Sequence, residues 1–153
     1  MEEKQKEQLT QKEQNSMLKT IYGYVNSYEG LNGLEVCFES FEDSGASLSL
    51  FSDQGASVIK RFITGGYRGY LPFALIYRSN PKSDIQKLNK IEYLNDLGSW
   101  LCDKSNYPDL ENIQIEKIEQ TSVPFKDNAN DAGDNDYIVT FDLYYRKGDL
   151  LWP

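Results

Sequence analysis

Histidine is missing from this chain of 153 residues, and cysteine occurs only twice. The absence of histidine excludes histidine-based catalytic triads and histidine metal sites. Cys102 follows Trp100 and Leu101, and Cys37 lies within an apolar stretch, so the sequence favours two reduced core thiols over a reactive nucleophile. These absences remove common catalytic groups, and we expect no cofactor.

Long apolar runs are also missing. No stretch approaches the ~20 apolar residues of a membrane span, and the polar amino terminus lacks the apolar core of a signal peptide. We therefore expect that the protein is made in the cytoplasm and does not contact a membrane. Sixteen basic and 24 acidic residues give a net charge of −8, which argues against a general phosphate-binding surface.

The length is that of one domain with its own core, because a chain of this size buries roughly 68–70% of its unfolded surface. Residues 1–15 are rich in Glu, Lys and Gln and offer almost nothing to bury, which predicts a flexible polar arm. We expect a single α+β domain over residues 16–153.

Two segments have the periodicity of amphipathic helices. The first begins near Ser16 and ends near Gly30, with apolar residues at spacings of three and four. The second follows Pro81 and starts with the S-x-x-Q spacing of a capping box, formed by Ser83 and Gln86. Its apolar stripe is expected to cover a sheet and consists of Ile85, Leu88, Ile91, Leu94, Leu97 and Leu101.

Six segments alternate like strands. Residues 34–41 and 47–51 predict an antiparallel hairpin, and residues 57–63 and 70–79 predict a second one around Gly65 and Gly66, which allow a tight turn. The last two strands are expected at residues 113–118 and 137–145. The order α-β-β-β-β-α-β-β predicts a largely antiparallel sheet of about six strands with both helices on one face.

Three patterns that could indicate phosphate binding, acid–base catalysis or metal binding are better interpreted as structural features. The glycine turn has neither dinucleotide-fingerprint spacing nor the lysine and serine of a phosphate loop. Two carboxylate pairs, Glu39 with Glu42 and Glu116 with Glu119, are interpreted as solvated charges. Residues 127–136 depart from the calcium-binding EF-hand pattern, which favours an acidic hairpin loop over a weak calcium site. We expect no metal.

Four segments in a fixed order resemble one phage family. They are RFITGGYRGYLPFALIYRS from Arg61, the capped helix that contains Trp100, IQIEKIEQTSVPF from Ile113, and DYIVTFDLYYRKGD from Asp136. In this order they resemble the minor capsid proteins of tailed phages and prophages of Gram-positive bacteria, at the tail-terminator position of the structural gene cluster. The resemblance covers residues 57–149.

The resemblance implies a structural protein without catalysis. Such a protein forms a ring, expected to be a hexamer, that caps the tail tube and joins it to the head connector. The implied partners are other copies of the chain, the tail-tube protein and the head-completion protein, while DNA passes through the lumen without specific binding. The implied location is the head-tail junction of a virion, assembled in the cytoplasm of the host bacterium.

Two groups of residues are candidate sites in such a ring. The chain is rich in Tyr and Phe, which are enriched at interfaces, and we expect Tyr67, Arg68 and Tyr70 to face a neighbouring subunit or the tube. The alternative for these three residues is a solvated hairpin tip. An acidic loop is expected to face the lumen or a neighbouring subunit, and its residues are Asp127, Asp131, Asp134 and Asp136.

Three alternatives to the tail terminator remain open at the level of sequence. They are another connector or minor capsid component, a cytoplasmic module that binds a peptide at a sheet edge, and a small enzyme that uses a carboxylate or a tyrosine in an unrecognised pocket.

Overall fold

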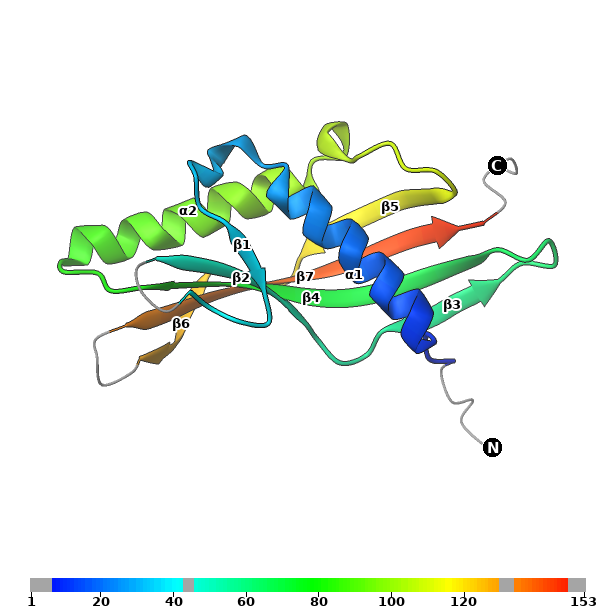
Figure 1. Cartoon of the computed structure of the whole chain (residues 1–153), viewed down its shortest axis with the longest axis horizontal. Coiled ribbons are helices and arrows are strands. Elements are labelled where there is room, and N and C mark those ends of the chain that lie inside the picture. The colour runs from blue at the N-terminus through cyan, green and yellow to red at the C-terminus, as the bar shows by residue number, and fades with distance from the viewer. Residues whose placement is uncertain (1–6, 43–45, 130–133, 149–153) are drawn as a thin grey trace.

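The computed structural model describes residues 7–42, 46–129 and 134–148 (Figure 1). No helix in these ranges is long and apolar enough to cross a membrane. The elements, in chain order, are α1 (Gln11–Asn26), η1 (Glu29–Leu31), β1 (Val36–Phe38), β2 (Ser47–Ser52), β3 (Ser57–Arg61), β4 (Tyr67–Ser79), α2 (Asp84–Cys102), η2 (Lys104–Asn106), β5 (Ile113–Gln120), β6 (Phe125–Ala129) and β7 (Asn135–Lys147).

A long antiparallel ribbon of β4 and β7 forms the centre of the sheet, with partners from Tyr67 and Lys147 at one end to Ser79 and Asn135 at the other. β2 and β3 pair with successive parts of β4, and β5 and β6 pair with successive parts of β7. The predicted α+β class is confirmed. The described part of the sheet has seven strands, one more than expected. The additional strand is β6, which lies in a segment that we expected to be a loop.

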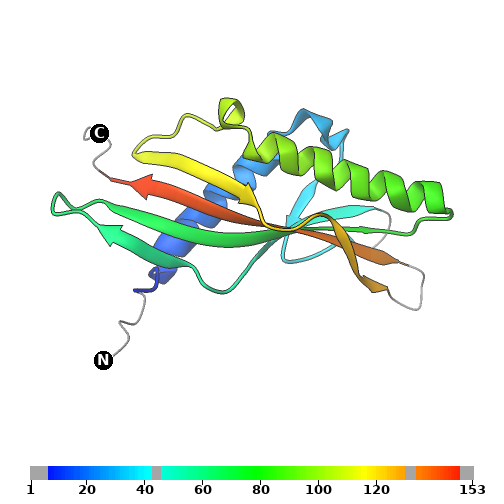
Figure 2. The same cartoon turned by 180° about the vertical axis from the view of Figure 1, so that it is seen from behind.

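The sheet has one covered face and one open face. Both helices lie on the same side, as expected. α1 crosses in front of the sheet in Figure 1 and behind it in Figure 2, and α2 packs through Leu94, Leu97 and Leu101 into the same core as α1. The odd-numbered residues of β4 and β7 point to the helices and are buried, and Phe73 and Phe141 stack at the centre with ring centroids 5.0 Å apart. We call this side the helix-covered face. The alternation of side-chain direction follows from the period of two in a strand.

Helix α1 begins five residues before the expected start. Thr10 caps it, since its hydroxyl accepts from the Glu13 backbone N–H at 3.1 Å while the Glu13 carboxylate accepts from the Thr10 N–H at 3.0 Å. Leu9 is buried, and the Glu7 carbonyl accepts a hydrogen bond from the Val58 N–H. The expected flexible arm over residues 1–15 is therefore wrong for residues 7–15. Residues 1–6 lie outside the described ranges.

Helix α2 begins where the sequence predicts, with Ser83 as its cap and Ser83 Oγ accepting from the Gln86 N–H at 3.2 Å. The predicted stripe covers the sheet only in part. Leu94, Leu97 and Leu101 are fully buried, whereas Ile85 and Leu88 are exposed. The first turns of α2 therefore lie beyond the packed part of the sheet, so the expectation of a fully covering stripe is wrong there.

The predicted antiparallel hairpin at residues 34–51 is wrong. β1 pairs with β2 in parallel, with Val36 opposite Leu48 and Phe38 opposite Leu50. Glu39 then adopts a left-handed conformation (φ 51°), and the chain turns back along β2, where the Glu42 N–H donates to Ser47 Oγ. The reversal at Glu39 therefore comes before the turn that we expected at residues 42–45, most of which lies outside the described ranges.

The predicted hairpin of β3 and β4 is confirmed, with residues 62–66 forming the glycine turn. Gly65 has φ +104°, which an L side chain rarely adopts. At Gly66 the constraint is steric, since a Cβ there would lie 2.7 Å from the Lys147 carbonyl oxygen. The two glycines therefore serve the turn and the close approach of β7.

Candidate functional site

The side of the sheet away from the helices is the candidate functional surface, and we call it the helix-free face (Figure 2). It consists of the even-numbered residues of β4 and β7 with their neighbours on β2, β3, β5 and β6. These even-numbered residues are mostly half-buried and polar or aromatic. The exceptions are Pro72 and Ala74 in the middle of β4, which are buried, so the surface is open mainly at the end next to the glycine turn.

Three cations lie side by side across neighbouring strands at the end of this face next to the glycine turn. Lys60 on β3 is opposite Arg68 on β4, and Arg68 is opposite Arg146 on β7. We call these three residues the basic row. Like charges directly opposite each other on neighbouring strands destabilise a sheet. The three cations are therefore expected to repel one another, although the chain as a whole has a net charge of −8.

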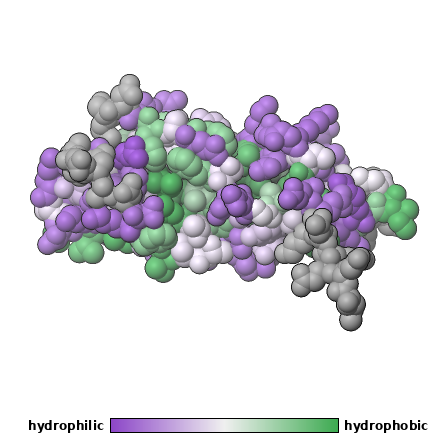
Figure 3. All heavy atoms as spheres, turned by 90° about the horizontal axis from the view of Figure 1, so that it is seen from below, coloured by the Kyte–Doolittle hydropathy of each residue, from purple (hydrophilic) through white to green (hydrophobic). Residues whose placement is uncertain are grey.

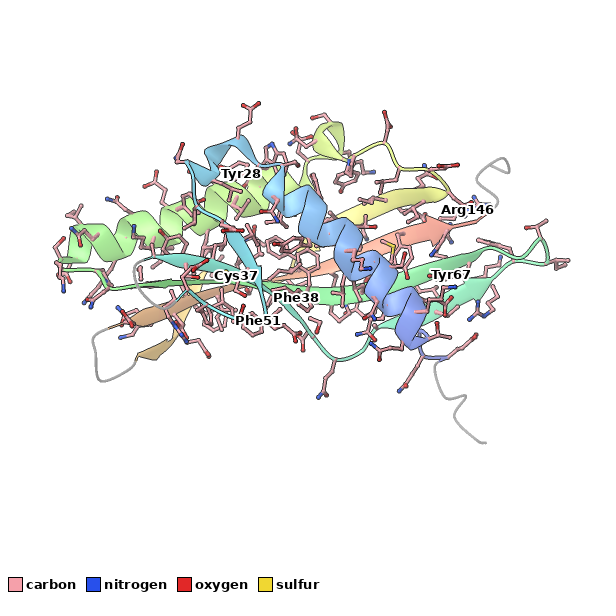
Figure 4. All side chains as sticks on the ribbon, viewed as in Figure 1. Tyr28, Cys37, Phe38, Phe51, Tyr67 and Arg146 are labelled. Carbon is pink, nitrogen blue, oxygen red and sulfur yellow. The ribbon has the colours of Figure 1, made fainter. Side chains whose placement is uncertain are left out.

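The basic row is only partly neutralised within the chain. Arg68 Nε forms a 2.6 Å ion pair with Glu116. Arg146 instead stacks on Phe62, with Cζ 4.6 Å from the ring centroid, and its buried Nε has no hydrogen-bond partner among the described residues. Figure 4 shows Arg146 near the carboxyl end of β7. Within the described residues, three cations therefore share one carboxylate contact.

Tyr67 does not belong to this surface. Its side chain is only 5% exposed on the helix-covered face, where its hydroxyl lies 3.1 Å from that of Tyr145 and the two rings meet edge to face. The expectation that Tyr67 faces a neighbouring molecule is corrected by this burial. The period of two along β4 separates it from Arg68 and Tyr70, which remain on the helix-free face.

Tyr70 belongs to an aromatic and polar group next to the basic row. Its hydroxyl donates to Asp142 at 2.8 Å, and its ring centroid lies 5.3 Å from that of Tyr144. Both tyrosines line a shallow pocket of about 440 Å³ together with Ser57, Val58 and Ile59. Burial and the carboxylate of Asp142 raise the pKa of Tyr70 to about 12.

Alkaline titration should reveal this environment. The pKa of Tyr70 is raised from 10.0 to about 12, so the folded state favours the protonated phenol. Its contribution to the free energy of unfolding is fully present below pH 10 and is lost as the pH rises towards about 12. We expect the phenolate absorbance of Tyr70 to appear at a higher pH in the folded protein than in the unfolded chain. The free energy of unfolding should fall over the same pH interval.

The control for this titration is Tyr70→Phe, which removes the ionisable group and keeps the ring. Its stability should depend less on pH over that interval than that of the natural chain. An unchanged pH dependence would assign the effect to other buried tyrosines, such as Tyr93, whose pKa burial also raises to about 12.

The expected acidic loop is shorter than residues 127–136. Asp127 lies on β6, and Asp136 lies on β7, where it accepts two hydrogen bonds from Arg78 at 2.8 and 3.0 Å. Pairing of β6 with β7 converts both ends of the segment into strands. Asp134 precedes β7, and Asp131 lies outside the described ranges. The described residues contain no group of His, Cys, Asp or Glu that could hold a metal ion.

The thiols and the carboxylate pairs have structural environments. Burial raises the pKa of the Cys102 thiol. The pKa of the Cys37 thiol is also raised, mainly by burial and to a smaller extent by the Glu42 carboxylate. Neither thiol is therefore activated as a nucleophile. Glu39 accepts from the Ser52 hydroxyl, and Glu119 pairs with Lys117 at 2.8 Å. These contacts give the thiols and carboxylates structural roles and do not require a catalytic one.

Sequence reasoning missed Lys60 and Arg146 as site residues because no local pattern places either of them beside Arg68. Lys60 becomes a neighbour of Arg68 through a register shift between Val58 and Lys60 in β3, and Arg146 through the pairing of β4 with β7. An excess of arginine and lysine near the ends of three predicted strands was the available signal.

No family model matches this sequence, and no curated protein matches it. The fold is similar to that of a chain in a solved structure described as the virion of a native gene transfer agent particle, with a TM-score of 0.53. The chain shares its fold with a virion component. The similarity covers 82% of this chain and 91% of that chain at 10% sequence identity. At this identity it establishes the arrangement of helices and strands.

Proposed function

We propose that this protein is a structural component of a phage-like virion, and more narrowly a tail terminator that forms a ring between the tail tube and the head connector. The observation on which this proposal rests is the fold similarity to the virion chain, which spans most of both chains. The resemblance of residues 57–149 to the minor capsid family gives the narrower position. Ring order, taken as six, belongs to the same proposal.

The environments of the candidate groups favour a structural role over catalysis. The two thiols have raised pKa values, and the candidate carboxylates form ion pairs or hydrogen bonds. A surface with an excess of acidic residues also suits a channel for DNA, because each neutralising Lys or Arg strengthens phosphate binding. We expect the lumen of the ring to be acidic and DNA to pass through it.

The sheet edges argue against the peptide-binding alternative. The outer edge of β3 is occupied by the chain itself, since Gln8 bridges to Ser57 and the Val58 N–H donates to the Glu7 carbonyl. β1, at the other end, has only three residues. On β5 a register shift between Ile115 and Lys117 interrupts the ladder. The edges of β3, β1 and β5 are therefore poorly suited to strand addition by a peptide.

The test is to purify particles from the bacterial strain that encodes the chain and to locate the protein in them. We expect a small, constant number of copies per particle, visible as a ring at the head-tail junction by electron microscopy. Deletion of the gene should leave unjoined heads and tails, and expression in trans should restore joined particles. Full particle assembly in the deletion strain, with the protein found only outside particles, would contradict the proposal.

A further inference from the structure

The turn between β3 and β4 presents an apolar side chain that the protomer leaves in water. Ile63, at the tip of this turn, is fully exposed. The turn lies at one end of the molecule, where the space-filling view shows a hydrophobic projection (Figure 1, Figure 3). Such a side chain gains stability when the pocket of a partner removes it from water.

Positive charge surrounds the base of the turn. Phe62, the residue before Ile63, lies between two cations of the basic row, with Lys60 Nζ 5.8 Å and Arg146 Cζ 4.6 Å from its ring centroid. Neither cation forms an ion pair within the described residues, where the ion pair of the row belongs to Arg68. The turn therefore suits an apolar pocket that is bordered by carboxylates.

An apolar hollow of about 300 Å³ lies between α1 and β1, and we call it the α1–β1 hollow. Phe38, at the end of β1 beside α1, is 41% exposed (Figure 4). The Tyr22 hydroxyl donates to the Val36 carbonyl oxygen at 2.8 Å, which holds α1 against β1. The lining residues are Asn15, Leu18, Lys19, Tyr22 and Phe38.

Carboxylates flank the strand that forms one wall of the hollow. Glu39 directly follows Phe38, and its carboxylate accepts hydrogen bonds from Ser52. Glu35 precedes β1 and is exposed. Neither glutamate forms an ion pair with a residue that the structure describes. This edge of the sheet is therefore opposite in charge to the base of the turn, although Lys19 reduces the difference.

We infer that the β3–β4 turn of one copy of this chain inserts Ile63 into the α1–β1 hollow of the next copy, with Lys60 and Arg146 facing Glu39. This inference rests on the proposed function and names the contact between the subunits of its ring. A contact between two different surfaces leaves one surface of each kind free on every chain of copies. It closes into a ring when the rotation between copies allows it.

The two surfaces lie far apart within one protomer. Next to the turn, Arg61 is opposite Tyr67 of β4. Next to the hollow, Phe38 is opposite Leu50, and Leu50 is opposite Leu75 of β4. The eight positions from Tyr67 to Leu75 span roughly 26 Å, so a contact between the turn and the hollow joins two copies.

Substitution at the tip is the first measurement, read as mass against concentration by light scattering of the full chain. Ile63→Asp should weaken self-association at least about tenfold, because it places a carboxylate in an apolar hollow beside Glu39. The matched control is Ile85→Asp, since Ile85 is also an exposed isoleucine but lies at the start of α2. The control should associate like the natural chain.

Charge exchange tests the polar part of the contact by the same measurement. Lys60→Glu and Glu39→Lys should each weaken self-association, and the double variant should recover part of the loss, because the pair is restored with its signs exchanged. The thermal transition of each variant checks its folding. If Glu39→Lys does not fold, Lys60→Gln and Glu39→Gln are compared instead, and their losses should be less than additive.

A disulfide across the contact is the second measurement. Thr64→Cys, at the turn, is combined with Lys19→Cys, at the hollow, in a chain that also has Cys37→Ala and Cys102→Ala. We expect mild oxidation to link this chain into a ladder of oligomers. The ladder is sought in the concentrated protein and in particles from a deletion strain that expresses the variant in trans. Either introduced cysteine alone should leave the chain unlinked.

Association that survives Ile63→Asp, or the absence of a ladder in both samples, overturns the inference. A link between two copies of Thr64→Cys alone also overturns it, in favour of a symmetric contact between turns, and so does a link from Thr64→Cys to a different virion protein. If the purified chain stays monomeric, the ladder in particles decides.

The outcomes separate this contact from the proposed function. A ring at the head-tail junction without the ladder overturns the contact and leaves the proposed function standing. A ladder in solution from a chain that is absent from particles supports the contact and contradicts the proposed function.

Discussion

Replacing Phe141 with alanine should lower the free energy of unfolding by about 3–5 kcal/mol, because it removes a buried aromatic ring from the centre of the core. Phe141 is 1% exposed and stacks on Phe73 of β4. On the helix side it lies against α2 at Gly98, where an added Cβ would be 3.3 Å from Phe141 Cζ. Its loss leaves a cavity between the ribbon and α2, measured as a lower denaturant midpoint in urea.

Phe125→Ala is the matched control for this substitution. Phe125 is also a strand phenylalanine, but it is 42% exposed. Its truncation should cost no more than about 1 kcal/mol, since less apolar area leaves the core. Equal losses for the two variants would contradict the packing of α2 over the middle of β7.

Replacing Gly69 with valine should destabilise the protein by about 1–3 kcal/mol or more, although valine usually favours a strand. Gly69 is opposite Tyr145 on the helix-covered face, and an added Cβ would lie 2.5 Å from Tyr145 Cζ. The ring cannot move away easily, because Tyr145 is fully buried and its hydroxyl lies 3.1 Å from that of Tyr67. The substitution must displace the tyrosine pair that supports the end of the ribbon next to the basic row.

Gly23→Ala in α1 tests whether the effect comes from the site or from glycine itself. No heavy atom lies within 4 Å of a Cβ built at Gly23, which is exposed. Alanine there should raise the free energy of unfolding by up to about 1 kcal/mol, through its higher helix propensity. Stabilisation by valine at position 69 would show that the Tyr145 ring does not fill the space above the glycine.

The strongest local signals of the sequence were sufficient for several elements. Ser83 accepts the hydrogen bond that starts α2, and the glycine turn joins β3 to β4 as predicted. The alternation of residues 67–79 also contained the correct side for Tyr67, opposite to Arg68 and Tyr70, but we placed all three on one surface. These features are readable because each depends on a few residues that are close in the chain.

The sequence by itself determined the α+β class, the second helix, the hairpin of β3 and β4, and the lack of histidine chemistry, since composition and local periodicity are enough for them. Only the tertiary structure decided that β1 runs parallel to β2 and that Lys60, Arg68 and Arg146 form one row. Strand register depends on pairing between residues far apart in the chain and on single-residue shifts. The candidate surface is a product of that register, and no local pattern encodes it.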